Sequence, residues 1–250
     1  MKRFCLVMVL LAAGVAMAFA AGELKVNTLT VKESWPLSED MKEYAAPEFE
    51  PGVSAMIDMP EGRSKLAVAV AKWIAKSLGV EGLDLNSADE LAQAVVTKLK
   101  REQADVATEF TVTKEYENAK LVTFMISGYD MAAGAAHGMP YCYGATFRKS
   151  DGKEMSDHLI RKNARLNTLL WRGLKEHYGV KDTELRNILN VNMKTVTMPS
   201  TSPWVTKDGV VFQYGAYEIA PYAAGMPQVI IRPSALTPYL TTEGKALLKK

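Results

Sequence analysis

Cysteine is nearly absent from this sequence. The 250-residue chain has two cysteines, Cys5 and Cys142. Since Cys5 lies in the apolar N-terminal segment, a processed chain would keep only Cys142, which excludes an internal disulfide. Free cysteine is usually buried, so we expect Cys142 to be a small core residue and not a reactive thiol.

An excess of charge of one sign is also missing. The chain has 30 basic and 28 acidic residues, and removal of Lys2 and Arg3 with the N-terminal segment leaves 28 of each. Proteins that bind nucleic acid or anionic membranes through their overall charge are strongly basic. We therefore expect neither a nucleic-acid partner nor charge-driven binding to membranes.

The common catalytic sequence patterns are absent as well. There is no Gly-x-Ser-x-Gly, no His-Glu-x-x-His, no Cys-x-x-Cys and no phosphate-binding glycine-rich loop. The three histidines, His137, His158 and His177, are too far apart in sequence to form a local metal pair. These absences predict a protein without a cofactor or metal and favour a function other than catalysis.

The N-terminus has the pattern of a signal peptide. Lys2 and Arg3 precede an uncharged segment, which ends in a small-x-small cleavage pattern at 16–20. We expect cleavage after Ala20, with no stable membrane anchor afterwards and a periplasmic or secreted location. The alternative is an uncleaved anchor, but the strongly apolar part (4–11) is far shorter than the ~20 residues that span a bilayer.

Alternating and helical patterns follow one another along the rest of the chain. Strands are expected at 24–32, 53–59, 109–116, 120–129, 141–148, 204–206, 210–218 and 229–231, and helices at 62–78, 88–104, 164–178 and 182–189. Recurring hairpin signals favour an α+β fold with antiparallel sheets and helices packed on one face. We divide the chain into a signal peptide (1–20) and two α+β subdomains (21–150 and 151–250).

Three helix ends have recognisable capping residues. Gly79 suits a left-handed C-terminal cap, and Ser87 with Glu90 forms a capping-box pattern. Asp182 is the expected N-cap of the short helix at 182–189.

Two segments rich in small residues and aromatics are candidate functional regions. The first surrounds His137, which has Gly or Ala on both sides, and continues to Tyr141 and Tyr143. Asp130 lies seven residues before His137 and could orient it as a general base. The alternative is a histidine that hydrogen-bonds to the backbone and holds a loop across the sheet.

The second segment runs from Tyr214 to Gly225. Together with nearby Trp204, its tyrosines Tyr214, Tyr217 and Tyr222 combine apolar area with polar tips, as residues of binding interfaces do. The alternative is a scaffold role, with Tyr217 and Ile219 facing the same side of a strand as Val211. We expect binding to involve His137, Tyr141, Tyr143 and Tyr222.

These two segments, within a region spanning 52–240, resemble the extracytoplasmic domain of the RsiV anti-sigma factors, which also precedes the catalytic domain of PdaC-type peptidoglycan deacetylases. In the anti-sigma factors this α+β domain senses lysozyme by direct binding. The resemblance implies an exported binding module. We do not expect signalling across a membrane or deacetylation, because the sequence shows neither a sigma-binding segment nor a deacetylase domain.

The resemblance therefore predicts a non-enzymatic binding protein of the bacterial cell envelope. Its partner would be a protein, such as a lysozyme-type muramidase, or peptidoglycan. Two alternatives stay open: a hydrolase of envelope polymers that uses His137 and Asp130, and a structural subunit of an envelope assembly.

Overall fold

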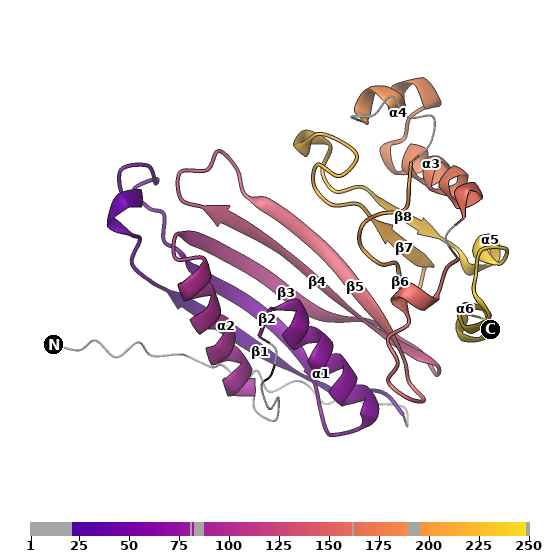
Figure 1. Cartoon of the computed structure of the whole chain (residues 1–250), viewed down its shortest axis with the longest axis horizontal. Coiled ribbons are helices and arrows are strands. Elements are labelled where there is room, and N and C mark those ends of the chain that lie inside the picture. The colour runs from indigo at the N-terminus through magenta and orange to yellow at the C-terminus, as the bar shows by residue number, and fades with distance from the viewer. Residues whose placement is uncertain (1–21, 81, 83–87, 162, 190–195, 249–250) are drawn as a thin grey trace. The chain divides into compact units, whose positions relative to one another are not determined.

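The computed structural model describes residues 22–80, 82, 88–161, 163–189 and 196–248 (Figure 1). The predicted signal peptide at 1–20 and Ser87 of the predicted capping box lie outside the described residues. The chain forms two compact units, which we call unit 1 (Met1–Thr113 and Ile126–Met139) and unit 2 (Lys114–Met125 and Pro140–Lys250). The boundaries of these two units therefore differ from the single division near residue 150 that we expected from the sequence.

The described elements follow the predicted order closely. The strands are β1 (Val26–Ser34), β2 (Gly52–Pro60), β3 (Val106–Glu117), β4 (Leu121–Ala132), β5 (Met139–Arg148), β6 (Trp204–Val205), β7 (Val210–Gln213) and β8 (Gln228–Ile231). The helices are α1 (Lys65–Ser77), α2 (Ala88–Glu102), α3 (Ala164–Tyr178), α4 (Asp182–Ile188), α5 (Pro233–Leu236) and α6 (Thr242–Leu248). Short 3-10 helices lie at η1 (Glu39–Met41), η2 (Ser156–His158) and η3 (Tyr222–Ala224).

The strands form a five-stranded sheet of order β1-β2-β3-β4-β5 and a three-stranded sheet of order β6-β7-β8. β1 and β2 are antiparallel, with Leu29 opposite Ile57. β3 and β4 are neighbours joined by only three residues, as the predicted hairpin requires.

One strand pair departs from the prediction of antiparallel sheets. β2 and β3 are parallel, with Gly52 opposite Ala107 and Ile57 opposite Val112. The reason is the connection between them, because α1 and α2 carry the chain back to the end of the sheet where β2 began. Strand patterns do not show this, since the pairing direction depends on the crossover.

In unit 1, α1 and α2 cover one face of the large sheet (Figure 1). Every second residue of β2 is buried, including Val53, Ala55 and Ile57, and α1 buries the stripe that contains Val70 and Ile74. Residues of opposite parity, such as the 53% exposed Met56, lie on the other face of the sheet. The described helices of unit 1 therefore lie on one face of the sheet, as predicted, and none of them covers the other face.

In unit 2, α3 packs on β8 of the small sheet. The approach is close, because a Cβ atom at Gly173 would overlap the side chain of Val229. Leu166, Leu170 and Leu174 of α3 are fully buried in one hydrophobic cluster with residues of β7 and β8. The predicted α+β class is confirmed.

The N-terminus of α4 corrects one predicted cap. The N-cap is Lys181, whose backbone N–H donates to the Glu184 carboxylate at 2.8 Å. Asp182 is the first helical residue, and its carboxylate accepts a hydrogen bond from Trp171 Nε1 at 2.9 Å and pairs with Lys175 Nζ at 2.9 Å. The Asp182 side chain, which we expected to cap its own helix, therefore binds two residues of α3 instead.

Within the described part of the chain, no helix combines the length and apolar character needed to cross a membrane.

Candidate functional site

The predicted tyrosine segment is a loop and not the end of a strand. β7 stops at Gln213, whereas the sequence predicted a strand to residue 218. Tyr217 has a left-handed backbone with a φ of 64°, which no strand contains. Tyr217 is therefore exposed while Ile219 is buried, and the expectation that they share one strand face is wrong. We call residues 214–225, between β7 and β8, the tyrosine loop.

The base of the tyrosine loop is anchored in unit 2. Tyr214 is fully buried, and its hydroxyl donates a hydrogen bond to the carbonyl oxygen of Thr197 at 2.8 Å. Burial, with a smaller effect of the Glu218 charge, raises the pKa of Tyr214, so this hydroxyl stays protonated. The amide of Gln213 donates to the carbonyl oxygens of Tyr214 and Met226, at 2.9 and 3.1 Å, and ties the two ends of the loop together.

Glu218 holds the loop from within. Its Oε1 accepts the backbone N–H of Ser200 at 2.6 Å, and its Oε2 accepts that of Gly215 at 2.7 Å. Hydrogen bonds to an ionised carboxylate are stronger than neutral ones. This carboxylate therefore fixes both the turn of the loop and its position against the segment that precedes β6.

An aromatic pair lies on the loop. Tyr217 is 49% exposed, and its ring centroid is 5.7 Å from that of the half-buried Tyr222, at 36° between the planes. A bulky residue at positive φ is a genuine conformational outlier and costs of order 1–3 kcal/mol. The surrounding hydrogen bonds thus hold an exposed ring in a conformation that the isolated chain would avoid.

The structure brings the predicted residues Tyr141 and Tyr143 together on β5. Both are half-buried, and their rings stack with centroids 6.4 Å apart and 29° between the planes. Cys142 between them points to the opposite side of the strand. Burial, and secondarily the Glu115 charge, raises the pKa of the Cys142 thiol to about 11. Its thiolate is therefore scarce at neutral pH, but Cys142 is only half-buried and is not the core residue that the sequence predicted.

Two aromatics for which the sequence left both an interface and a scaffold role open are core residues. Trp204 is 1% exposed, and Tyr214 is fully buried. A Cβ atom at Gly144 would meet the Trp204 ring at 2.7 Å, so the glycine lets the indole approach β5. Their polar atoms and large area serve the packing of unit 2.

His137 lies in unit 1, whereas the three predicted tyrosines lie in unit 2. Its side chain is exposed, and Nδ1 is 3.0 Å from the carbonyl oxygen of Gly138. The backbone N–H of Gly138 donates to the hydroxyl of Tyr129 at 2.8 Å. A loop that closes through such backbone contacts agrees with the scaffold interpretation of this segment.

Asp130 does not show the geometry of a base-orienting carboxylate. Its Oδ1 is buried and has no hydrogen-bond partner in the part of the chain that the structure describes. Desolvation raises the pKa of Asp130, and a hydrogen bond from Thr108 opposes that shift. A catalytic pair through this atom would require a hydrogen bond between Oδ1 and the His137 ring. Oδ1 makes no such bond.

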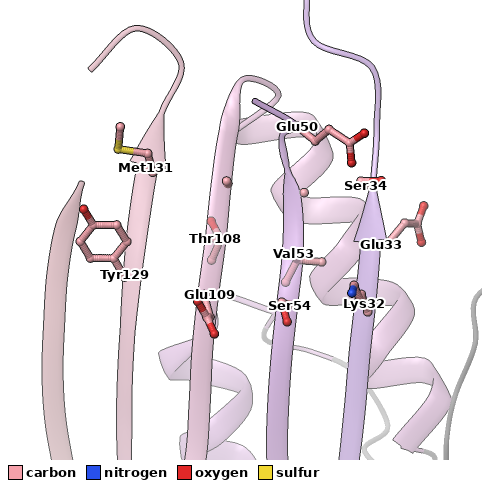
Figure 2. Close-up of a pocket in the computed structure, with 12 residues that line it drawn as sticks. Lys32, Glu33, Ser34, Glu50, Val53, Ser54, Thr108, Glu109, Tyr129 and Met131 are labelled. Atoms are coloured by element: carbon pink, nitrogen blue, oxygen red, sulfur yellow. The ribbon is translucent and has the colours of Figure 1, made fainter. Parts of the chain in front are cut away.

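Tyr129 connects the His137 loop to a pocket on the helix-free face of the sheet (Figure 2). The pocket has a volume of about 570 Å³ and lies at one end of β1, β2, β3 and β4. Figure 2 shows Tyr129 and Met131 on one strand, Thr108 and Glu109 on the next, and Ser54 beyond them. The remaining charged lining residues are Lys32, Glu33 and Glu50. Carboxylates outnumber cations in this lining, so the pocket suits a neutral or cationic polar group.

Sequence reasoning missed this pocket. Its strand residues come from four strands, at positions at least 18 residues apart along the chain, and each strand contributes two or three of them. The one available signal was the outward parity of Ser54, Glu109 and Tyr129, opposite to that of the buried residues on the same strands. Outward parity alone does not distinguish a pocket from an ordinary solvated face.

Comparisons with known proteins agree with this fold. Residues 157–234 match the model of the family described as "Protein of unknown function (DUF3298)". A solved DUF3298 family structure from Bacteroides fragilis NCTC 9343 is similar, with a TM-score of 0.66 and 18% identity over 90% of this chain and 96% of that chain. Another, from Pseudomonas aeruginosa PAO1, has a TM-score of 0.62 and 16% identity, over 88% of this chain and 95% of that chain. No curated protein sequence matches the chain.

These similarities define a protein with a DUF3298-type α+β fold. The segment that matches the DUF3298 family model, residues 157–234, includes the whole tyrosine loop but not His137. The match confirms the predicted resemblance and is consistent with a DUF3298/RsiV-type domain. At 16–18% identity, the solved structures support the fold alone.

Proposed function

We propose that this protein is an exported, non-enzymatic binding protein of the bacterial cell envelope. Its ligand is a protein, such as a lysozyme-type muramidase, or peptidoglycan. The observation that carries the proposal is the Tyr217–Tyr222 pair on a loop held by Glu218. The resemblance to RsiV-type domains supports the same function.

A rigid aromatic pair suits binding for an energetic reason. A loop that already has its bound conformation loses less conformational entropy on association, so more of the contact energy remains as affinity. Tyrosine adds a large apolar face and a hydroxyl tip, and it orders only two side-chain torsions. Strain at Tyr217 is the kind of cost that persists where an exposed ring has a function.

A pulldown with two ligands tests the proposal. The immobilised chain is incubated with a lysozyme-type muramidase or with purified peptidoglycan, and bound ligand is quantified. We expect one ligand to be retained, and the Tyr217→Ala/Tyr222→Ala double variant to retain at least about tenfold less, as for central aromatic residues of an interface. Tyr44→Ala is the matched control, because Tyr44 is a 67% exposed tyrosine of unit 1.

The proposal fails if the unaltered chain retains neither ligand. It also fails if the double variant and the control retain equal amounts while both melt at the temperature of the unaltered chain.

Export is part of the proposal and has its own test. The basic and apolar residues of 1–20 support it. Mass spectrometry of the chain from a native host should find an N-terminus at Ala21 in the periplasmic or secreted fraction. Recovery of the uncleaved chain from the cytoplasm contradicts this part of the proposal.

The alternative function is a hydrolase of envelope polymers that uses His137 and Asp130. One observation favours it: Asp130 has a buried oxygen without a hydrogen-bond partner among the described residues, and its pKa is raised, and active-site acids share both properties. In that case His137→Ala should abolish release of soluble fragments from peptidoglycan with almost no change in melting temperature. If the unaltered chain releases no fragments, or if the variant chiefly loses stability, the hydrolase alternative is excluded.

A further inference from the structure

A second pocket in unit 2 has a different chemical character from the pocket of unit 1. It has a volume of about 720 Å³ and is lined by the β6–β7 turn, by α5 with its flanking residues, and by α6. Its charged lining residues are Lys207, Asp208, Arg232 and Lys245. Three cations thus face one carboxylate, although the chain as a whole is nearly neutral.

The one carboxylate of the pocket neutralises little of this charge. Asp208 Oδ2 lies 3.8 Å from Lys207 Nζ, and the two side chains are 63% and 81% exposed. Such exposed pairs interact weakly because water screens them. Among the residues that the structure describes, Arg232 and Lys245 have no ion-pair partner.

The neighbouring acidic residue of α6 is engaged elsewhere. Glu243 pairs with Lys153 at 3.1 Å and with Arg148 at 3.4 Å, on the turn that follows β5. Those two cations lower the pKa of Glu243, so the carboxylate stays charged and bound to them. Lys245, two residues later on the same helix, is therefore left for the pocket.

The pocket also has an apolar component. Leu240 is 4% exposed and belongs to the core cluster of unit 2, and Leu248 packs against that cluster. Pro233 adds a third apolar surface, and the exposed Ser234 adds a hydroxyl donor. Apolar side chains with a few converging polar groups are typical of small-molecule pockets of this volume.

We propose that this pocket binds an anionic amphiphile, that is, a phosphate or carboxylate head group on an apolar chain. Arg232, Lys245 and Lys207 contact the head group, and Leu240 and Leu248 contact the first carbons of the chain. The three cations are the reason to expect a negatively charged head group, and the two leucines are the reason to expect an apolar chain. This site is independent of the tyrosine loop and of the binding function proposed above.

Calorimetric titration of the full chain with n-octyl phosphate below its critical micelle concentration tests the proposal. We expect octyl phosphate to bind at least about tenfold more tightly than inorganic phosphate, the gain from burial of roughly two methylene groups. Zwitterionic octylphosphocholine should bind at least about tenfold more weakly than octyl phosphate. Affinity for octyl phosphate should fall as salt rises, because salt screens the exposed cations.

Two double variants separate the pocket from general charge. Arg232→Gln/Lys245→Gln should lose at least about tenfold in affinity for octyl phosphate. The control is Arg172→Gln/Lys72→Gln, which removes the same two charges from exposed positions on α3 and α1 and should bind as the unaltered chain does. Both variants keep the apolar N-terminal segment, so any binding to that segment cancels in the comparison.

Three results overturn the proposal: no binding of octyl phosphate, equal affinity for inorganic phosphate and octyl phosphate, or equal loss in the two double variants with unchanged melting temperatures. Vesicles of phosphatidylglycerol and of phosphatidylcholine then identify the source of the head group. Charge-dependent vesicle binding indicates a membrane lipid, and binding of octyl phosphate alone indicates a free amphiphile.

Discussion

Two loops of similar composition have opposite structural roles in this protein. The loop at 132–138 of unit 1 and the tyrosine loop of unit 2 are both rich in glycine and alanine. In the first, small residues allow close packing: a Cβ atom at Gly134 would lie 3.1 Å from Tyr44 Cβ, and one at Gly138 would meet the Tyr129 ring. In the second, a Cβ atom at Gly215 would make only an ordinary contact, 3.6 Å from Glu218 Oε2, and the ring of Tyr217 is exposed.

This difference shows that a glycine-rich loop is not by itself a binding loop. In unit 1 the missing side chains are a packing requirement, since Tyr129 occupies the space beside Gly138. In unit 2 they permit turns, and hydrogen bonds to Glu218 supply the rigidity. Substitutions in the two loops should therefore change the stability of the chain by different amounts. Four predictions follow, in order of decreasing effect.

The largest effect is expected from Gly138→Ala. The new Cβ would lie 2.5 Å from the carbonyl oxygen of Asp130 and overlap the Tyr129 ring. Such overpacking costs about 2–3 kcal/mol, which lowers the melting temperature of a chain of this size by about 4–12 °C. Gly215→Ala is the matched change in the tyrosine loop and should be nearly neutral, because the closest atom is 3.6 Å away. Equal melting temperatures for the two variants would remove the distinction between the loops.

Glu218→Ala should have the next largest effect. It removes the acceptor of two backbone N–H groups, at Ser200 and Gly215, for about 1–2 kcal/mol in an exposed setting. Glu218→Gln keeps one acceptor oxygen and should lose about half as much, whereas Glu176→Ala on an exposed part of α3 should lose almost nothing. Thermal melting measures all three, and a Glu218 variant as stable as the Glu176 control would mean that the carboxylate does not hold the loop.

Tyr217→Gly should separate stability from binding. Glycine adopts a φ of 64° without strain, so the melting temperature should stay the same or rise by up to about 4 °C. Retention of the ligand in the pulldown should fall at the same time, because the exposed ring is gone. A clear loss of stability would indicate that Tyr217 is a packing residue, and the two loops would then be alike.

The smallest effect is expected from Asp130→Asn, and it should depend on pH. Burial raises the pKa of Asp130, so the folded chain holds this proton more tightly than the unfolded chain does. Ionisation of Asp130 therefore lowers stability as the pH rises above the unfolded value of about 3.9. Asparagine should raise the melting temperature at pH 7 and not at pH 3, while Asp40→Asn at an exposed site should change neither. An equal gain at both pH values would contradict the role of ionisation.

The sequence predicted those features that depend on near neighbours. The apolar stripe with Val70 and Ile74 placed α1 within three residues of its observed start and one of its end, and 164–178 matches α3 at both ends. The hairpin of β3 and β4 was found from alternation on both sides of a three-residue turn. Each pattern lies within about 15 residues, where helical or alternating geometry decides which side chains share a face.

The candidate site was predicted only in part. Tyr222 was singled out, but its partner Tyr217 was assigned to a strand, because alternation does not reveal a left-handed residue or the hydrogen bond between Glu218 and the distant Ser200. Tyr141 and Tyr143 were expected on one face of β5, and they stack there. For Trp204 the sequence left an interface role and a scaffold role open, and the structure shows it buried, because Gly144 leaves space for its ring.

The sequence alone determined the class of fold and the position of nearly every element. It also indicated that Cys142 is not a reactive thiol. Tertiary structure alone decided the parallel pairing of β2 with β3, the conformation of the tyrosine loop and the two pockets. The physical reason is distance along the chain. A periodic pattern reflects interactions of each residue with its near neighbours in the chain. A pocket, or a loop held by hydrogen bonds, depends on groups that meet only after strands and helices far apart in the sequence have packed.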